Sequence, residues 1–229
     1  MIMKYFLILG FLLLNLTAHA QIELRGDLGD VYYSKDLYKT TYNSPEGSPY
    51  LNENFTPAKI NDINETKLVR FNAYEDRIEV MVEENKVIVL PDTQTYTISL
   101  LDGSNKVFET KNYLDEKGNL KNSFFELIVI KEKHSLYLKE KIEFTKAVKA
   151  QGYQDSQPAM FKKQKESYFI TDFKGQSDQL IYLPRKLKNF LKLFPAHSKT
   201  IKSFIKDNKL KIDKSGDLLK IFDFYFSRP

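Results

Sequence analysis

The sequence predicts an α+β fold, in which an antiparallel β-meander sheet or open barrel of roughly eight or more strands carries two to three C-terminal helices packed against it. Short runs of alternating apolar and polar residues fill the stretch from Lys67 to Val148, and turns rich in Gly, Asn and Asp separate them. After Pro184 the spacing of apolar residues changes from two to three and four. A period of two is typical of strands with one covered face, and a spacing of three and four is typical of amphipathic helices.

The first 20 residues have the pattern of a secretory signal peptide. A positively charged start is followed by an apolar run from Tyr5 to Leu14 and by the small residues of Thr17-Ala18-His19-Ala20. We expect cleavage between Ala20 and Gln21, and a periplasmic or extracellular location. The alternative is a membrane anchor, but a spanning helix needs roughly 20 apolar residues. The sequence contains no cysteine, so neither a disulfide nor a lipid-attachment cysteine is expected.

Charge is distributed unevenly after the predicted cleavage point. Residues 184–229 contain 12 Lys and Arg against 4 Asp, a net charge of +8, whereas residues 21–183 carry a net charge of −4. Opposite signs favour docking of the tail on the body of the protein, or binding of an anionic partner to the tail. On this basis we divide the chain into an irregular N-terminal segment (21–66), an antiparallel β domain (67–183) and a basic helical segment (184–229).

The N-terminal segment contains a loop, residues 43–57, in which three prolines and a glycine alternate with large apolar side chains. The prolines exclude a helix and disfavour a central strand. One interpretation is an ordered loop that Tyr50, Leu51 and Phe55 attach to the sheet. The other is a partner-binding loop in which Tyr50 and Phe55 make the contacts.

The predicted β domain contains nine runs with strand character. They are Lys67–Asn72, Arg77–Glu83, Lys86–Leu90, Thr95–Leu101, Lys106–Thr110, Ser123–Lys131, Ser135–Val148, Ser167–Phe173 and Gln179–Leu183. The polar stretch 149–165, with Gly152 and Pro158, is predicted to be a connecting loop. Apolar residues occupy both faces of 124–130 apart from Glu126, so we expect a central strand that is covered on both sides.

In the second of these runs, the alternation assigns residues to two faces. Ile78 and Val80 are expected to face the core, and Glu79 is expected on the solvent face.

Three helices are predicted in the basic segment. The first runs from Pro184 to Pro195, the second follows a cap at Ser198, and the last is capped by Ser215 or Asp217. Five lysines on the predicted polar faces could contact anionic lipid or envelope polysaccharide: Lys188, Lys192, Lys199, Lys202 and Lys206. No nucleic-acid-binding motif accompanies them, so nucleic acid is not expected as a partner.

Few residues suggest catalysis. His134, in a predicted hairpin turn, and His197 are expected to be exposed, and without cysteine they do not make a metal site. The adjacent acids Glu75–Asp76 and Glu83–Glu84 are the candidates for a glycoside hydrolase. Acids in turns are usually solvated, so we assign no catalytic residue, metal or cofactor.

The chain resembles a group of uncharacterised secreted proteins of Bacteroidota. The resemblance rests on the Ala-His-Ala-Gln cleavage region and on four further stretches: 47–55, 70–76, 188–195 and 206–210. It implies export in a Gram-negative envelope and transfers no activity. Together these features predict an exported, non-catalytic binding or assembly protein with an envelope protein or polymer as partner. The alternatives are a hydrolase that uses acidic residues and a binder of anionic lipid or polysaccharide.

Overall fold

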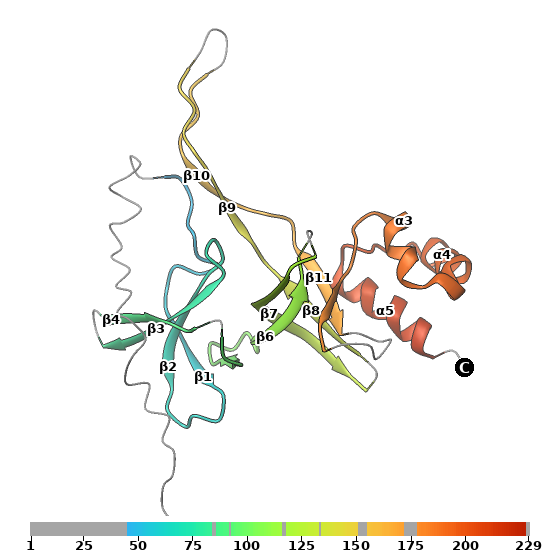
Figure 1. Cartoon of the computed structure of the whole chain (residues 1–229), viewed down its shortest axis with the longest axis horizontal. Coiled ribbons are helices and arrows are strands. Elements are labelled where there is room, and N and C mark those ends of the chain that lie inside the picture. Colours follow the sequence, from blue (N-terminus) through green and yellow to red (C-terminus); the bar gives the residue numbers. More distant parts are fainter. Residues whose placement is uncertain are drawn as a thin grey trace, which may run out of the picture. The chain divides into compact units, whose positions relative to one another are not determined.

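The computed structural model describes residues 45–83, 86–91, 93–115, 118–132, 134–150, 155–171 and 178–227, so the predicted signal peptide lies outside it. This part of the chain has the predicted α+β organisation, with strands followed by short helices at the C-terminal end (Figure 1). The strands are β1 (Thr56–Ile60), β2 (Lys67–Asn72), β3 (Arg77–Glu83), β4 (Lys86–Val89), β5 (Thr97–Leu100), β6 (Val107–Leu114), β7 (Leu120–Lys131), β8 (His134–Lys139), β9 (Ile142–Thr145), β10 (Met160–Lys163), β11 (Ser167–Thr171) and β12 (Leu180–Tyr182). The helices are α3 (Leu187–Phe190), α4 (Ser198–Asp207) and α5 (Ser215–Phe226), with 3-10 turns at Leu191–Leu193 and Pro195–His197.

Ten of these strands form one sheet in the order β12-β11-β8-β7-β6-β5-β1-β2-β3-β4, and neighbours in this order are antiparallel. A parallel pairing of Leu180 in β12 with Tyr113 in β6 also joins two strands that are not neighbours in this order. Strands β6, β7, β8, β11 and β12 therefore form a closed ring, and the remaining five strands extend the sheet from β6. The predicted antiparallel sheet is confirmed.

Strand β7 is covered on both faces around Phe124 and Phe125, as predicted, whereas Ile130 near its end is 68% exposed. Phe125 is fully buried inside the ring, together with Tyr137, Phe169 and Leu180. The preceding residue, Phe124, is buried in a different cluster. Because consecutive side chains of a strand point to opposite faces, β7 contributes to two separate cores.

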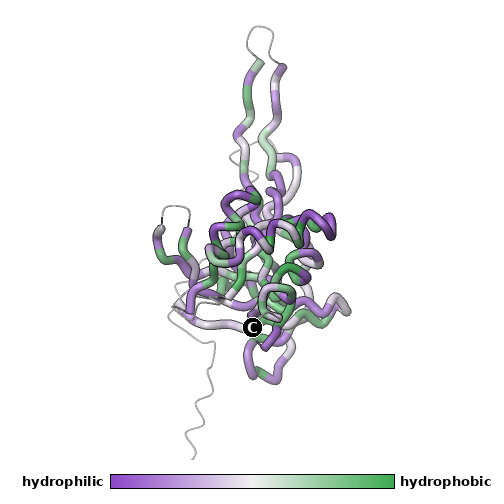
Figure 2. Tube along the Cα trace, turned by 90° about the vertical axis from the view of Figure 1, so that its right-hand side faces the viewer, coloured by the Kyte–Doolittle hydropathy of each residue, from purple (hydrophilic) through white to green (hydrophobic). Residues whose placement is uncertain are grey.

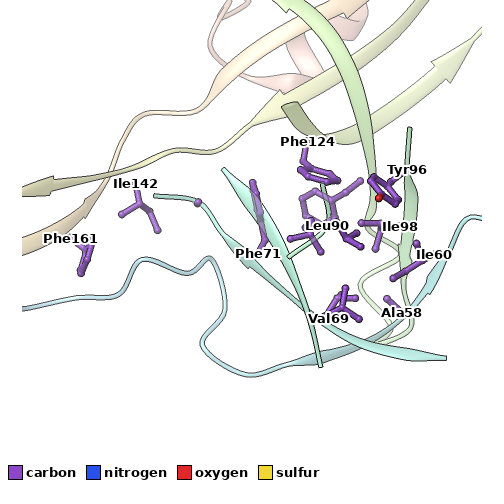
Figure 3. Close-up of a cluster of buried hydrophobic side chains, with 14 residues drawn as sticks. Ala58, Ile60, Val69, Phe71, Leu90, Tyr96, Ile98, Phe124, Ile142 and Phe161 are labelled. Atoms are coloured by element: carbon purple, nitrogen blue, oxygen red, sulfur yellow. The ribbon is translucent and has the colours of Figure 1, made fainter. Parts of the chain in front are cut away.

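The second cluster belongs mainly to the other half of the sheet, and Figure 3 shows its side chains gathered between the strands. We call it the sheet core. Its buried members are Ala58, Ile60, Val69, Phe71, Ala73, Ile78, Val80, Leu90, Tyr96, Ile98, Phe108, Phe124, Ile142 and Phe161.

The helices cover the outer face of β8 and β11 through a third cluster, the helix core (Figure 1). Leu136 and Ile170 of the strands are fully buried there against Phe190, Ile201 and Phe222 of the helices. Hydrophobic and hydrophilic residues are mixed along the chain near its C-terminal end (Figure 2), as expected for helices with one covered side. The predicted packing of C-terminal helices against the sheet is confirmed.

Several predicted boundaries were wrong. The first predicted helix is divided into α3 and a 3-10 turn, and neither α4 nor α5 has a side-chain cap: their N-cap residues are His197 and Lys214. The predicted strand 135–148 is divided into β8 and β9. Residues 140–141 separate the two strands, and no Gly or Pro marks this break in the sequence.

Two strands were not predicted. Strand β1 begins in the Pro-rich loop, and it tolerates Pro57 because its described pairing with β5 starts only at Ala58. Strand β10 lies in the predicted connecting loop 149–165 and pairs with β9 (Figure 1). This two-stranded ribbon continues to an isolated bridge between Val148 and Gln157.

His134 is buried, contrary to the prediction. Its ring stacks on Phe226 of α5 at 4.7 Å between centroids and lies 5.7 Å from Phe222, and the residue is only 5% exposed. Among the described residues neither ring nitrogen has a hydrogen-bond partner. The sequence pattern indicated a hairpin turn correctly but could not show that α5 packs over it.

Burial lowers the pKa of His134 below the ordinary value of 6.5; the carboxylate of Asp223 opposes this effect and Lys131 reinforces it. The unfolded chain therefore binds a proton at a higher pH than the folded chain does. We expect the free energy of unfolding to be constant above the ordinary pKa and to fall as the pH drops below it, until the folded protein is protonated as well.

Chemical denaturation between pH 8 and pH 5 checks this expectation. His134→Phe, a ring that does not titrate, should remove most of the loss of stability, whereas His197→Gln should keep it. An unchanged pH profile in the His134 variant would show that the loss arises elsewhere.

Candidate functional site

The Pro-rich loop is attached to the end of β2, as the first of the two interpretations predicts. Tyr50 forms an isolated antiparallel bridge with Asn72, and the backbone N–H of Leu51 donates to the carbonyl oxygen of Phe71 at 3.1 Å. Residues 45–55, which we call the aromatic loop, therefore lie along the sheet rather than extending from it.

The rings of Tyr50 and Phe55, the two predicted contact residues, both pack against the guanidinium group of Arg70. The guanidinium carbon of Arg70 lies 3.6 Å from the ring centroid of Tyr50 and 4.4 Å from that of Phe55. Both rings are partly buried in this arrangement. A cation over an aromatic face is attractive, and more so where water is excluded. Tyr50 and Phe55 are thus engaged within the protein, where they hold the aromatic loop on β2.

Arg70 is also paired with Glu79 on β3. Its Nη2 and Nε lie 2.5 and 3.1 Å from Glu79 Oε2, and Tyr50 Oη donates to Glu79 Oε1 at 3.3 Å. The side chains of Arg70 and Glu79 are 9% and 2% exposed. Burial, followed by the negative charge of Glu79, raises the pKa of Tyr50 to about 12.

The prediction that Glu79 lies on the solvent face was therefore wrong. The alternation along β3 places Glu79 on the side opposite Ile78 and Val80, but the aromatic loop covers that side. Because a strand pattern records only which residues share a face, it cannot show that a distant loop folds over the polar one.

Behind the aromatic loop lies a pocket of about 260 Å³. Residues of the loop, of β1, β2, β3, β5, β6 and β10, of the β5–β6 turn and of the β8–β9 connection surround it. Its apolar floor is formed by Val69, Phe71, Ile78, Ile98, Leu100 and Phe108, most of them buried members of the sheet core (Figure 3). The rest of the lining is Leu51, Asn52, Asn54, Thr56, Arg70, Asp102, Ser104, Lys106, Glu140 and Lys163. Sequence reasoning missed this pocket because its parts come from distant segments.

The basic residues at the pocket are paired with carboxylates. Lys106 Nζ lies 2.8 Å from Glu126 Oε2, and Lys163 forms an ion pair with Glu140. Arg70 is held by Glu79 as described above. Asp102 accepts hydrogen bonds from the backbone N–H and the hydroxyl of Ser104, and these bonds lower its pKa.

The five lysines of the predicted anionic-partner site are all exposed. Lys188 and Lys192 lie on α3 and the following 3-10 turn, and Lys199, Lys202 and Lys206 lie on α4. In the part of the chain that the structure describes, none of them forms an ion pair. We call these five residues the lysine face. No hydrogen bond, ion pair or ring contact between described residues joins it to Tyr50 or Phe55.

Attraction between the basic tail and the acidic body does not explain how the helices dock. Among the described residues, one ion pair joins a helix to the sheet, and it has the reverse polarity: Lys131 of β7 lies 3.1 Å from Asp223 of α5. Both side chains are more than 40% exposed, so this pair contributes little to stability. The helices are instead held by the apolar side chains of the helix core.

A polar cluster joins the β2–β3 turn to the ring. Lys139 Nζ lies 2.7 Å from Asp76 Oδ2 and also donates to Ser123, whose hydroxyl donates to Asp76 Oδ2 at 2.5 Å. Burial beside the rings of Phe125 and Tyr113 lowers the pKa of Lys139. Asp76 adopts a φ of 60°, which is uncommon for a residue with a side chain.

A serine beside an amine of lowered pKa can form a nucleophile. Here, however, the Ser123 hydroxyl donates to a carboxylate, and Ser123 is only 3% exposed. The cluster therefore serves to tie the turn to β7 and β8.

The carboxylates of the first predicted acidic pair are engaged in other contacts. Asp76 is bound to Lys139 and Ser123, and Glu75 lies 3.9 Å from Arg77. Of the second predicted pair, Glu84 lies outside the described residues. No group of three or more His, Asp or Glu that could hold a metal ion is found among the residues with described positions.

Comparison with known proteins gives no match to a family model, a curated protein or a solved structure.

The buried Arg70–Glu79 pair predicts a large effect of removing one charge. We expect Glu79→Gln to lower the free energy of unfolding by about 3–5 kcal/mol, because Arg70 then remains buried without its counter-charge. The matched control is Glu143→Gln, which removes the partner of Lys141 in a pair whose side chains are 59% and 50% exposed. That change should cost less than about 1 kcal/mol. Urea denaturation of both variants measures the difference, and equal effects would show that the buried pair does not hold the aromatic loop.

Proposed function

We propose that this chain is an exported, non-catalytic binding or assembly protein of the cell envelope, and that the pocket behind the aromatic loop is its binding site. The observation that carries the proposal is the pocket itself, which combines an apolar floor with a polar rim. Concave sites of this composition are typical of ligand binding. In this proposal Tyr50 and Phe55 act indirectly. Their contacts with Arg70 hold the aromatic loop in place, and the loop forms one wall of the pocket.

Export is supported by the sequence of residues 1–20 and by the resemblance to secreted proteins of Bacteroidota. Among the described helices, none has the length and apolar character needed to cross a membrane.

A second candidate function is binding of anionic lipid or envelope polysaccharide by the lysine face. It is supported by the exposure of these five lysines, none of which forms an ion pair with a described carboxylate. Each lysine near an anionic lipid surface contributes about 1 kcal/mol of attraction, which salt weakens. The remaining alternative, hydrolysis by acidic residues, has no such observation in its favour, since Asp76 and Glu75 are engaged in other pairs.

The binding proposal predicts that filling the pocket abolishes partner retention. Leu100 lies in the lining and is partly buried, whereas its neighbour Leu101 is 49% exposed and outside the lining. Tagged protein would be used to capture partners from envelope extracts, washed at low and at high salt. We expect a component that survives high salt to be retained by the parent protein and by Leu101→Trp but lost with Leu100→Trp.

Thermal melting of both variants accompanies the capture, because overpacking of a core costs about 1–3 kcal/mol. Retention of the same component by a folded Leu100→Trp variant would remove the pocket from the proposed function.

The lysine face predicts a different result on vesicles of phosphatidylethanolamine and phosphatidylglycerol. Changing Lys199, Lys202 and Lys206 together to Gln should weaken the free energy of binding to the vesicles by about 3 kcal/mol at low salt, as measured by co-sedimentation. The matched control changes Lys146, Lys149 and Lys162 to Gln, three exposed lysines on or next to the β9–β10 ribbon. Equal losses in the two variants would indicate a general charge effect and contradict a lysine-face site.

A further inference from the structure

We infer that the pocket behind the aromatic loop receives one large, electrically neutral apolar side chain of a partner polypeptide. This inference rests on the proposed binding function and specifies its ligand. Three features of the pocket lead to it: the composition of the floor together with the volume, the pairing of the charges at the rim, and the polar groups of the loop.

The floor offers contact to apolar atoms only. Val69, Ile78 and Ile98 of three different strands form the buried base of the floor, and the partly buried Leu51 and Leu100 with the rings of Phe71 and Phe108 complete its surface. Figure 3 shows Val69, Phe71 and Ile98 within one cluster of side chains. A polar group that enters this space would lose its contacts with water without gaining hydrogen bonds from the floor.

The volume fits a single side chain. At about 260 Å³ the pocket is slightly smaller than the roughly 300–1,000 Å³ of sites for drug-sized molecules. An aromatic or branched aliphatic side chain fits within such a space.

The rim does not select an anion. Each of the three cations in the lining is already within ion-pair distance of a carboxylate: Arg70 of Glu79, Lys106 of Glu126 and Lys163 of Glu140. The remaining charge of the lining, Asp102, is negative. A carboxylate or phosphate would have to displace one of these pairs, and an ammonium group would have to exchange water for the apolar floor, so a neutral ligand is favoured.

The polar part of the rim suits a polypeptide backbone. Asn52 and Asn54 are exposed at the tip of the aromatic loop, and one local hydrogen bond, from the Asn54 N–H to Asn52 Oδ1 at 3.1 Å, orients them. Side-chain amides carry both donors and acceptors. They can therefore bond the peptide groups on either side of a side chain that enters the pocket.

Methyl-detected NMR of the full chain tests the inference with small probes. The neutral probe is N-acetyl-phenylalanine N-methylamide, and the charged probes are N-acetyl-phenylalanine with its free carboxylate and N-acetyl-lysine N-methylamide. We expect the neutral probe to shift the methyl signals of Val69, Ile78 and Ile98. Either charged probe should bind at least about tenfold more weakly, because the carboxylate finds no cation without a partner at the rim and the ammonium group of the lysine side chain would lose water on entering the apolar floor. Toluene is included as an aromatic molecule without peptide groups, and it should bind more weakly than the neutral peptide probe.

Two variants connect the signal to the pocket. Leu100→Trp should abolish the shifts, and Leu101→Trp should leave them unchanged. Ser104→Trp covers the rim from an exposed position, so it tests the site without disturbing the core if the Leu100 variant does not fold.

Equal or tighter binding of a charged probe, binding of toluene alone, or no binding of any probe would each overturn the inference. If none of the probes binds but capture from envelope extracts still depends on Leu100, the proposed binding function stands and only the ligand assignment fails. If capture is also independent of Leu100, both fail.

Discussion

Strand β7 carries large apolar side chains on both faces, and a folded chain has to cover each face with a different layer. Phe125 points into the ring that β6, β7, β8, β11 and β12 close, and Phe124 points into the sheet core of the other half. The same alternation along β8 and β11 leaves Leu136 and Ile170 outside the ring, where the helices bury them. Since short helices are marginal alone, α3, α4 and α5 depend on this outer face as much as it depends on them. The chain therefore buries its apolar side chains in three separate cores: inside the ring, in the other half of the sheet, and under the helices.

Buried polar groups fix the parts that apolar packing alone would not position. The Arg70–Glu79 pair and the rings of Tyr50 and Phe55 hold a loop whose prolines prevent continuous strand pairing. Asp76, Ser123 and Lys139 perform the same role at the β2–β3 turn. Burying such charges is costly, and the cost is offset only when each group keeps its partners and geometry. These two polar clusters therefore fix the orientation of the segments they join. The Arg70–Glu79 cluster positions the aromatic loop, which forms one wall of the pocket.

The local sequence pattern predicted much of the sheet correctly, but it did not predict the pocket or the residues that surround it. Strands β2 and β3 have the predicted bounds, and the turns at Gly103 and Gly118 have the positive φ that their composition favours. Glu79 and His134 were misplaced for one shared reason, because a polar residue at an alternating or turn position looks exposed until a distant element covers it. Likewise, the sequence pattern predicted Tyr50 and Phe55 as contact residues but did not show that Arg70 is the residue they contact. The pocket joins residues 51 to 163, a juxtaposition that depends on strand order, which periodicity does not encode.

The two proposed binding surfaces depend on different cores. The pocket is part of the sheet core, whereas the lysine face is carried by helices that pack in the helix core. Substitutions that share no neighbours usually have additive effects on stability, so damage to one surface should leave the other intact. If a ligand at one surface did alter the other, the change would have to pass through the ring, where β7 contributes Phe124 to the sheet core and packs Ile128 and Val129 against the helix core. The aromatic filling of the ring resists this, because Phe125 and Phe169 lie edge to face at 4.9 Å and leave little room for rearrangement. The fold therefore favours two independent surfaces over a coupled pair.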